Sequence, residues 1–266
     1  MTSLERDPLR WLRRSGESPS QLPLVHALER ATLNAVPSRR VAFDGPFVVR
    51  AFLGGTGRAN AACSLDPSPD PDMAVRVERI AAHYRRLGLK PRIRSSPLDP
   101  AGLPAHLRAT GWDEEDESLV TCGPLAGLAV ADPDVTILDA PDAAWFEVLG
   151  TVEYQSPARH AEKQDAVPLF AVRAAWMVLR LEGVPAAVLS ATCDGKYFGL
   201  FDLAVRPEFR RRGLIGRAIG AAAFWAAAQG AEHVFAQVSA TNTVSIALQA
   251  GTGMVERYRY SYFTRK

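Results

Sequence analysis

The second half of the chain alternates between the hydrophobic period of a strand and that of a helix. Residues 202–205 follow the aromatic pair 197–198 and predict a buried strand. From residue 214 onward, apolar side chains recur at 214, 218, 222 and 225, which lie on one face of an α-helix. Apolar residues at 234, 236 and 238 then predict a second strand over 233–239. A last helix near 242–249 and a terminal strand over 258–263 complete the pattern.

The first half repeats this order of elements. It predicts a helix over 73–87, a strand over 91–95, a short helix over 103–109 and a strand over 118–121. Gly88 and Gly111, which follow the two helices, are 23 residues apart, and so are Gly230 and Gly253 in the second half. We therefore interpret the chain as two copies of one unit, offset by 142 residues.

The composition fits two joined domains. The chain has 266 residues, 47% of them hydrophobic, which is enough apolar material for two cores. A stretch rich in glycine and proline over 123–133 predicts the join between them. We expect an N-terminal segment over 1–21, a first domain over 22–125 that opens with a helix around 23–34, and a second domain over 134–266. The expected fold class is α/β (α+β), with a mixed sheet in each half.

Charge and cysteine content exclude several classes of protein. A net charge of +2, with no aromatic residues interleaved among the basic ones, argues against a nucleic-acid partner. No apolar stretch reaches the length of a membrane span and the N-terminus has no hydrophobic signal core, so we expect a cytoplasmic protein with no membrane partner. Cys63, Cys122 and Cys193 lack the spacing of metal ligands, and we expect three reduced, buried thiols and no metal site.

The turn between the strand at 202–205 and the helix that begins at Leu214 predicts a phosphate site. Backbone N–H groups at a helix start have no partner within the helix and lie at the positive end of its dipole. Gly213 and Gly216 lack the Cβ that keeps a ligand away from the backbone, and three consecutive arginines, 210–212, add positive charge.

At these residues the chain resembles the GNAT superfamily, the Gcn5-related N-acetyltransferases, which bind the pyrophosphate of acetyl-CoA with an Arg/Gln-x-x-Gly-x-Gly/Ala turn. Arg210-x-x-Gly213-x-Ile215 fits this turn except at Ile215, where the family usually has a small residue. Downstream, Asn242, Ser245 and Leu248 match the family pattern Asn-x-x-Ala/Ser-x-x-Leu-Tyr. Gln249 replaces the tyrosine and Met254 the usual aromatic residue. The resemblance covers residues 136–266.

The resemblance implies an acetyl-CoA-dependent N-acetyltransferase with two GNAT-like halves in tandem, of which only the C-terminal half is complete. It implies that a small-molecule amine or a peptide attacks the thioester directly, while backbone N–H groups of a splayed strand polarise the thioester oxygen. The residues implied to contact acetyl-CoA are Leu203, Ala204, Val205, Arg210, Arg211, Arg212, Gly213, Leu214, Ile215, Gly216, Arg217, Asn242 and Ser245.

Asp202 is the leading candidate for the catalytic base. It sits in an otherwise apolar strand, where burial would raise its pKa toward neutrality. The alternative, a structural carboxylate that fixes a neighbouring loop, is equally open. Glu153 and His160 lie where the family places the segment that covers the acceptor, and Glu153 is the second catalytic candidate. For His160 a packing role is the commoner interpretation of a lone histidine.

Gln249 has no proton to donate to a departing thiolate. The tyrosines at 154, 197, 258, 260 and 262 remain as possible acids, and the residues do not rank them. Trp145, Trp176 and Trp225 can line an acceptor pocket, but core packing is the better interpretation for the last two.

The first half has no equivalent phosphate turn. The repeat places Ser68–Pro71, within an acidic and proline-rich loop, at the position of Arg210–Gly213, so we expect no CoA binding there. The glycine-rich run 54–57 predicts a hairpin or wide turn rather than a phosphate loop, and the acidic run 113–117 predicts a solvated turn. The competing hypothesis to an enzyme is a non-catalytic sensor or regulatory module that binds acetyl-CoA without consuming it.

Overall fold

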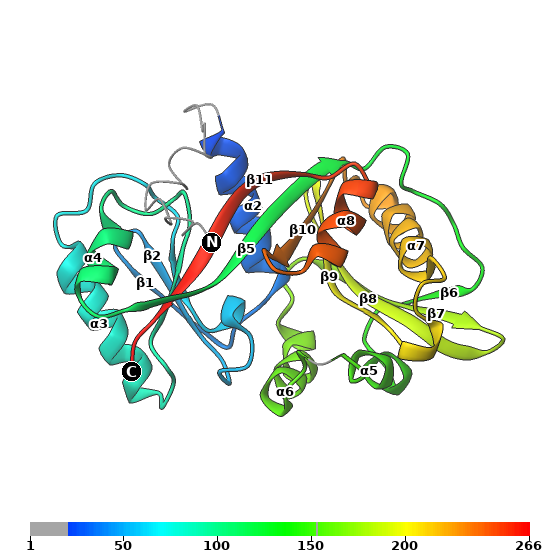
Figure 1. Cartoon of the computed structure of the whole chain (residues 1–266), viewed down its shortest axis with the longest axis horizontal. Helices are drawn as coiled ribbons and strands as arrows, with labels where there is room; N and C mark the ends of the chain where they lie inside the picture. Colours follow the sequence, from blue (N-terminus) through cyan, green and yellow to red (C-terminus); the bar gives the residue numbers. More distant parts are fainter. Residues whose placement is uncertain (1–20, 153) are drawn as a thin grey trace, which may run out of the picture.

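A computed structural model describes residues 21–152 and 154–266, which form one mixed sheet with helices on both faces (Figure 1). The front half contains α2 (Leu22–Ala35), β1 (Arg40–Asp44), β2 (Phe47–Ala51), the 3₁₀ helix η1 (Gly57–Ala59), β3 (Ala62–Ser64), α3 (Met73–Arg86), β4 (Arg92–Ser95), α4 (Leu103–Ala109) and β5 (Asp113–Pro124). The rear half contains β6 (Val135–Leu138), α5 (Ala143–Leu149), α6 (Pro157–Ala166), η2 (Val167–Leu169), β7 (Arg173–Leu181), β8 (Val184–Asp194), β9 (Tyr197–Val205), η3 (Pro207–Phe209), α7 (Leu214–Ala228), β10 (His233–Ser239), α8 (Thr243–Gly251) and β11 (Val255–Thr264).

The predicted repeat of elements is present. The succession α3, β4, α4, β5 in the front half matches α7, β10, α8, β11 in the rear half. In each half the strand before the long helix pairs in parallel with the strand after it, β3 with β4 and β9 with β10. We keep the division into domains at 22–125 and 134–266 as a proposal that follows this repeat.

The last strand of each half is inserted into the sheet of the other half. The strand order is β1-β2-β3-β4-β11-β5-β10-β9-β8-β7-β6 among the described residues. β11 therefore lies between the two final strands of the front half, and β5 lies between the two final strands of the rear half (Figure 1). The two halves cannot separate without breaking the hydrogen bonds of both strands.

The acidic run 113–117 belongs to β5, and the prediction of a solvated turn there is wrong. Its residues pair with β11, with Asp113 opposite Thr264 and Glu115 opposite Tyr262. Their mostly exposed carboxylates meet basic side chains, such as Arg108 against Glu114 at 2.6 Å. The polar composition of this run did not indicate a strand, although its backbone pairs with β11 on both sides of a bulge at residues 116–117.

Four clusters of buried apolar side chains hold the sheet and the helices together, one of them within the front half. On β7, Ala175, Met177 and Leu179 face α7, while Trp176 and Val178 face α5, as the two-residue period of a strand requires. α2 packs across the junction of the halves in a further core that contains Leu28, Phe201, Phe235 and Tyr258. α2 thus belongs to the front half in sequence and covers strands of the rear half.

Two sequence-based expectations concern single elements. The three cysteines are free and buried, as predicted, and burial with the nearby Glu29 charge raises the pKa of Cys63 to about 12. The run 54–57 lies in the connection between the antiparallel strands β2 and β3, which confirms the prediction of a wide turn. Within residues 21–152 and 154–266, no helix combines the length and hydrophobicity needed to cross a membrane.

Candidate active site

β9 and β10 diverge at the centre of the rear half. Their parallel ladder begins at Tyr197 with His233 and ends at Leu200 with Ala236, although β9 continues to Val205. A β-bulge lies at the point of divergence, because Leu189 of β8 is opposite both Asp202 and Leu203. Beyond Leu200, β9 thus has no partner on its β10 side among the described strands. Its backbone there is open to a ligand.

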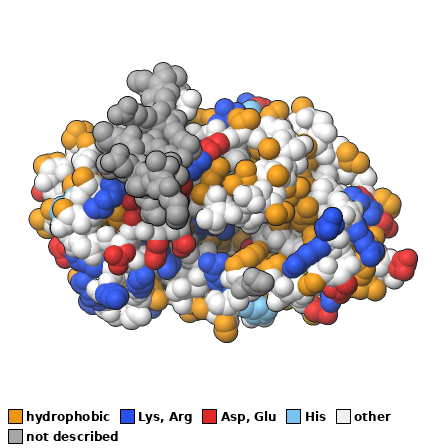
Figure 2. Space-filling model, viewed as in Figure 1, with side chains coloured by type: hydrophobic (Ala, Val, Ile, Leu, Met, Phe, Trp, Pro, Cys, Tyr) orange, Lys and Arg blue, Asp and Glu red, His pale blue; other side chains and the backbone are white. Residues whose placement is uncertain are grey.

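The turn after β9 presents a row of unpaired N–H groups. Gly213 adopts a left-handed backbone, with φ of 71°, and α7 begins at the next residue. The backbone N–H groups of residues 211–215 donate to no acceptor among the described residues, whereas those of Gly216 and Arg217 already bond the Gly213 carbonyl. Arg210, Arg211 and Arg212 are exposed around this turn. Figure 2 shows Lys and Arg side chains gathered where α7 begins. Free N–H groups beside exposed arginines are the features with which a helix N-terminus can bind an anion.

Two residues of the predicted turn contact the protein itself. Arg217 forms a bidentate pair with Asp132, at 2.7 and 2.8 Å, and also contacts Asp134 at 2.5 Å. Its charge is therefore compensated within the protein. Ile215, which stands where the GNAT pattern has a small residue, packs against the rear core.

At the start of α8, the side chains explain one departure from the GNAT pattern. Asn242 caps the helix, because its Oδ1 accepts a hydrogen bond from the Ser245 N–H at 3.0 Å. Gln249 is buried and accepts a hydrogen bond from the Thr121 hydroxyl at 2.6 Å. This glutamine thus forms part of the packing between α8 and β5.

A cavity of about 90 Å³ lies between the two halves, next to the bulge of β9. The rear half supplies Trp145, Tyr154, Lys163, Trp176, Ser190 and Asp202, and the front half supplies Phe52, Thr56, Arg58 and Ala59. Trp145 and Trp176 are buried in the core and at the same time form an aromatic part of the cavity wall. The sequence did not assign the front half to this wall.

Asp202 is embedded in ionic contacts in this cavity. It accepts hydrogen bonds from the Lys163 ammonium and, at 2.9 Å, from the Ser190 hydroxyl. Its φ of 56° is left-handed, a conformation that aspartate and asparagine tolerate better than most residues. Burial alone raises the pKa of Asp202, but Lys163, the Ser190 hydroxyl and Arg58 outweigh burial and lower it below its ordinary value. The expectation that the resulting pKa of Asp202 is raised toward neutrality is wrong.

Glu162 is the main site residue that the sequence did not reveal. Its carboxylate is buried and accepts hydrogen bonds from the backbone N–H groups of Leu53, Gly55 and Thr56 at 3.0, 2.8 and 2.6 Å. The Asn60 side chain donates a further bond at 2.6 Å. The loop 53–57 therefore does bind an anion, and that anion belongs to α6 of the same chain.

The glycine at position 55 permits this contact. A Cβ there would lie 2.7 Å from the backbone nitrogen of Arg159 and equally close to the Glu162 carboxylate. Arg159 in turn donates to the Gly55 carbonyl at 3.2 Å. The front-half loop and α6 thus fit closely together, and α6 carries Lys163 toward Asp202. The glycine-rich run was the only signal of such a site.

The other candidate residues named from the sequence differ in where they lie. Glu153 lies outside the described residues. The His160 ring packs at a tilt against Phe146, with ring centroids 4.7 Å apart, which agrees with a packing role. Tyr258 and Tyr260 are buried in the core at the junction, where Tyr258 donates to Glu29 and Tyr260 to Gln237. Tyr154 lines the cavity, and burial together with the Asp202 charge raises its pKa to about 12.

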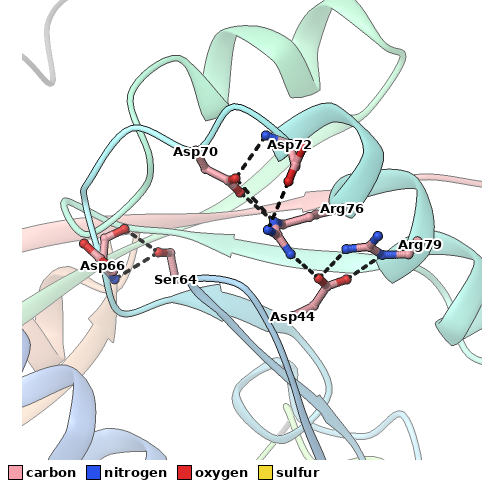
Figure 3. A network of polar contacts seen from close by, with 7 residues as sticks. All are labelled: Asp44, Ser64, Asp66, Asp70, Asp72, Arg76 and Arg79. Carbon is pink, nitrogen blue, oxygen red and sulfur yellow. Dashed lines mark hydrogen bonds and ion pairs between the residues drawn. The ribbon is translucent and has the colours of Figure 1, made fainter.

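The corresponding turn of the front half is closed by its own side chains (Figure 3). Arg76 contacts Asp44, Asp70 and Asp72 at 2.6, 3.0 and 3.4 Å. The N–H groups of Ser68 and Asp72 bond aspartate oxygens within the loop. Two of its N–H groups are bonded within the loop and Arg76 is paired with aspartates, so this turn lacks the unpaired positive charge of residues 210–212. It supports the expectation that the front half does not bind CoA.

A splayed and bulged strand, followed by an unpaired arginine turn at a helix start, defines a GNAT acetyltransferase. The model of the family described as "Probable histone acetyltransferase Rv0428c C-terminal" matches residues 24–263, and the chain belongs to this family. Because the match includes both halves, the front half is an integral part of the family's architecture.

Relatives and solved structures agree with this assignment. The "Uncharacterized N-acetyltransferase YobR" of Bacillus subtilis (strain 168) is 25% identical over 235 residues, which cover 86% of this chain and 94% of the relative. A GCN5-related N-acetyltransferase from Kribbella flavida has a TM-score of 0.68 at 16% identity, over 90% of this chain and 94% of that one. A tandem GNAT protein from the clavulanic acid biosynthesis pathway has a TM-score of 0.59 at 12% identity, over 94% and 95%. The predicted mixed α/β fold of tandem GNAT type is confirmed.

Proposed function

We propose that the protein transfers an acetyl group from acetyl-CoA to the primary amine of an acceptor bound between the two halves. The observation that carries this proposal is the row of unpaired N–H groups at residues 211–215, which directly follows the bulged strand β9. A pyrophosphate needs several hydrogen-bond donors and a positive potential at one place, and this turn supplies both.

The proposed contacts to acetyl-CoA extend from this turn along β9. Arg210, Arg211 and Arg212 add charge at the phosphates, and Gly213 and Gly216 allow close approach of the backbone. Leu214 and Ile215 contribute N–H groups. Leu203, Ala204 and Val205 present the strand edge to the pantetheine arm. The start of α8, with Asn242 and Ser245, closes the far side, whereas Arg217 acts through its pairs with Asp132 and Asp134.

Acetyl-CoA supplies an activated thioester, which the amine of the acceptor attacks directly. N–H groups near the bulge are placed to polarise the thioester oxygen as charge develops on it. An alkyl amine has a pKa of about 10.4 and is largely protonated at pH 7. Because the pKa of Asp202 is lowered, its carboxylate is ionised at that pH and too weak a base to deprotonate such an amine. We infer that Asp202 orients the amine by accepting an N–H bond, and that the proton leaves through water.

Tyr154 is the proposed proton donor to the departing thiolate. It is the described tyrosine that lines the cavity beside Asp202, whereas Tyr258 and Tyr260 are fixed in the junction core. The Tyr154 hydroxyl is protonated at neutral pH, and its raised pKa makes it a weaker acid than an ordinary tyrosine. A thiol has a pKa of about 8.5 and can also leave as a thiolate unaided, so the loss of Tyr154 should slow turnover only modestly.

A sensor that only binds acetyl-CoA is the competing function. The experiment that separates the two combines thermal unfolding with acetyl-CoA and a thiol-release assay with a panel of primary amines. The enzyme is stabilised by acetyl-CoA and releases free thiol only when an amine is present. A sensor is stabilised in the same way and releases none.

A further inference from the structure

Among the described residues that line the cavity between the halves, one charged side chain, Arg58, has a buried nitrogen with no hydrogen-bond partner. Asp202 pairs with Lys163, and Glu162 is held by backbone N–H groups and Asn60. Arg159 donates to a backbone carbonyl and lies over the Tyr154 ring, 5.9 Å from its centroid. The remaining charged residue of the described lining is Arg58, which comes from η1 of the front half.

Arg58 has no carboxylate within ion-pair distance among the described residues. Its terminal nitrogen donates to the Gln237 side-chain oxygen at 3.3 Å, and its guanidinium lies 5.5 Å from the centre of the Phe201 ring. Its Nε is buried and has no hydrogen-bond partner in the described part of the chain. The side-chain oxygen and nitrogen of Gln155, which lines the same cavity, are likewise buried and unpartnered there.

A guanidinium that is partly removed from water with an unused donor is unfavourable unless a ligand completes its contacts. The five N–H groups of arginine match the two oxygens of a carboxylate in a bidentate pair. Within the described part of the chain, the cavity lining carries three cationic side chains, Arg58, Arg159 and Lys163, against two carboxylates, Asp202 and Glu162. An acceptor that brings one negative charge would balance this lining.

We propose that the acceptor is an amino acid, bound with its carboxylate at Arg58 and its amine at Asp202. The inference rests on the proposed function and adds the substrate class. The front half thereby provides specificity, since Arg58 lies on η1, directly after its glycine-rich loop. The aromatic wall formed by Trp145, Phe170 and Trp176 favours an apolar side chain on that amino acid.

The test compares acetyl transfer to leucine, to leucinamide and to 3-methylbutylamine, which is leucine without its carboxylate. Leucinamide represents the amine of a peptide, because an amide replaces its carboxylate. The structure predicts a kcat/KM for leucine at least about tenfold higher than for the other two, the usual effect of a charge-assisted hydrogen bond. Equal or faster transfer to 3-methylbutylamine overturns the proposal, and a preference for leucinamide assigns the cavity to peptides.

Arg58→Gln provides the residue-specific arm. It should lower kcat/KM for leucine about tenfold or more and affect 3-methylbutylamine far less, while the thermal shift with acetyl-CoA is retained. Arg85→Gln, an exposed arginine on α3 of the same half, is the matched control and should leave both substrates unaffected. A parallel loss for both amines in Arg58→Gln contradicts the assigned role.

Failure of catalysis is distinguishable from failure of carboxylate recognition. If acetyl-CoA is bound but no amine is acetylated, the proposed function is wrong, and titration calorimetry on the CoA-bound protein still decides the ligand class. Leucine that binds at least about tenfold tighter than 3-methylbutylamine, with the difference abolished in Arg58→Gln, supports the amino-acid site. Equal affinities, or no binding of either ligand, rejects it.

Discussion

The side-chain amide of Asn60 donates a hydrogen bond to the Glu162 carboxylate, 2.6 Å away, across 102 residues of sequence. Together with three backbone N–H donors from residues 53–56, it fixes α6 against the front-half loop. The next residue on α6, Lys163, pairs with Asp202 at the bulge of β9. The front half therefore helps to position the Lys163–Asp202 pair of the rear half.

Glu162→Ala should destabilise the protein by about 3 kcal/mol, because it leaves several buried donors without an acceptor. The loosened α6 should raise KM for the acceptor more than the dissociation constant for acetyl-CoA, which contacts other elements. Chemical denaturation and steady-state kinetics measure the two effects. Asp165→Asn is the control on the same helix, since Asp165 forms a mostly exposed pair with Arg39. Equal effects from the two variants would show that the Glu162 contacts are energetically minor.

Gly216→Val tests the predicted approach of the phosphates to α7. A Cβ at this helical glycine meets nothing within 4 Å, so the folded protein accommodates it, while the side chain occupies space that the ligand needs. The variant should lose the thermal shift produced by CoA. Gly251→Val, at a helical glycine of α8 with equally open space, is the matched control and should keep the shift. Retention of the shift in both variants would place the cofactor elsewhere.

Replacement of Arg210 and Arg212 together by glutamine should weaken CoA more than dephospho-CoA, and dephospho-CoA more than pantetheine, because the ligands carry successively fewer phosphates. Titration calorimetry with the three ligands measures the order. Arg217→Gln should instead lower the melting temperature through loss of its contacts to Asp132 and Asp134, with a smaller effect on CoA affinity. A uniform weakening of all three ligands in the double variant would make the two arginines structural.

Asp202→Asn should lower kcat/KM by about tenfold to a hundredfold, and this factor should be the same at every pH from 6 to 9. Asparagine keeps the shape and tolerates the left-handed backbone, but it removes the charge that orients the amine. The factor is constant because the lowered pKa leaves Asp202 ionised throughout this range. A loss that shrinks as the pH rises would instead identify Asp202 as the base. Asp194→Asn, which changes an exposed carboxylate bonded to Asn34, is the control.

Asp202 should also stabilise the fold in a pH-dependent way. A carboxylate with a lowered folded-state pKa contributes stability that is present above its unfolded pKa, about 3.9, and is lost as the pH falls through the folded value. The difference in unfolding free energy between the wild type and Asp202→Asn should be constant near neutral pH and shrink below about pH 4. Urea denaturation between pH 3 and pH 7 measures it. A difference that grows with acidity would contradict the lowered pKa.

The helices and strands that the sequence predicted each leave a pattern of apolar residues and glycines within their own segment. The apolar stripe from Leu214 and the glycine before it set both the helix and the turn that precedes it. The exchange of β5 and β11 was not predictable, since strand pairing over more than a hundred residues leaves no local pattern, and the acidic run 113–117 has the composition of a turn.

The chemistry of the site depended on contacts that sequence reasoning could not see. The apolar neighbours of Asp202 correctly predicted its burial, but its pKa is set by Lys163, 39 residues away. Glu162 resembles any surface carboxylate of a helix until the loop 53–57 closes over it. The glycines of that loop indicated exposed N–H groups, and only the structure shows which anion uses them.

The most direct test of the account is mass spectrometry of the products after incubation of the full-length protein with isotopically labelled acetyl-CoA and an equimolar mixture of primary amines. The account predicts that the label appears as an N-acetyl group on an amine in a one-to-one ratio with free CoA, and that Gly216→Val abolishes both products. Stabilisation by acetyl-CoA without label on any amine would contradict the account and identify the protein as a binder of the cofactor.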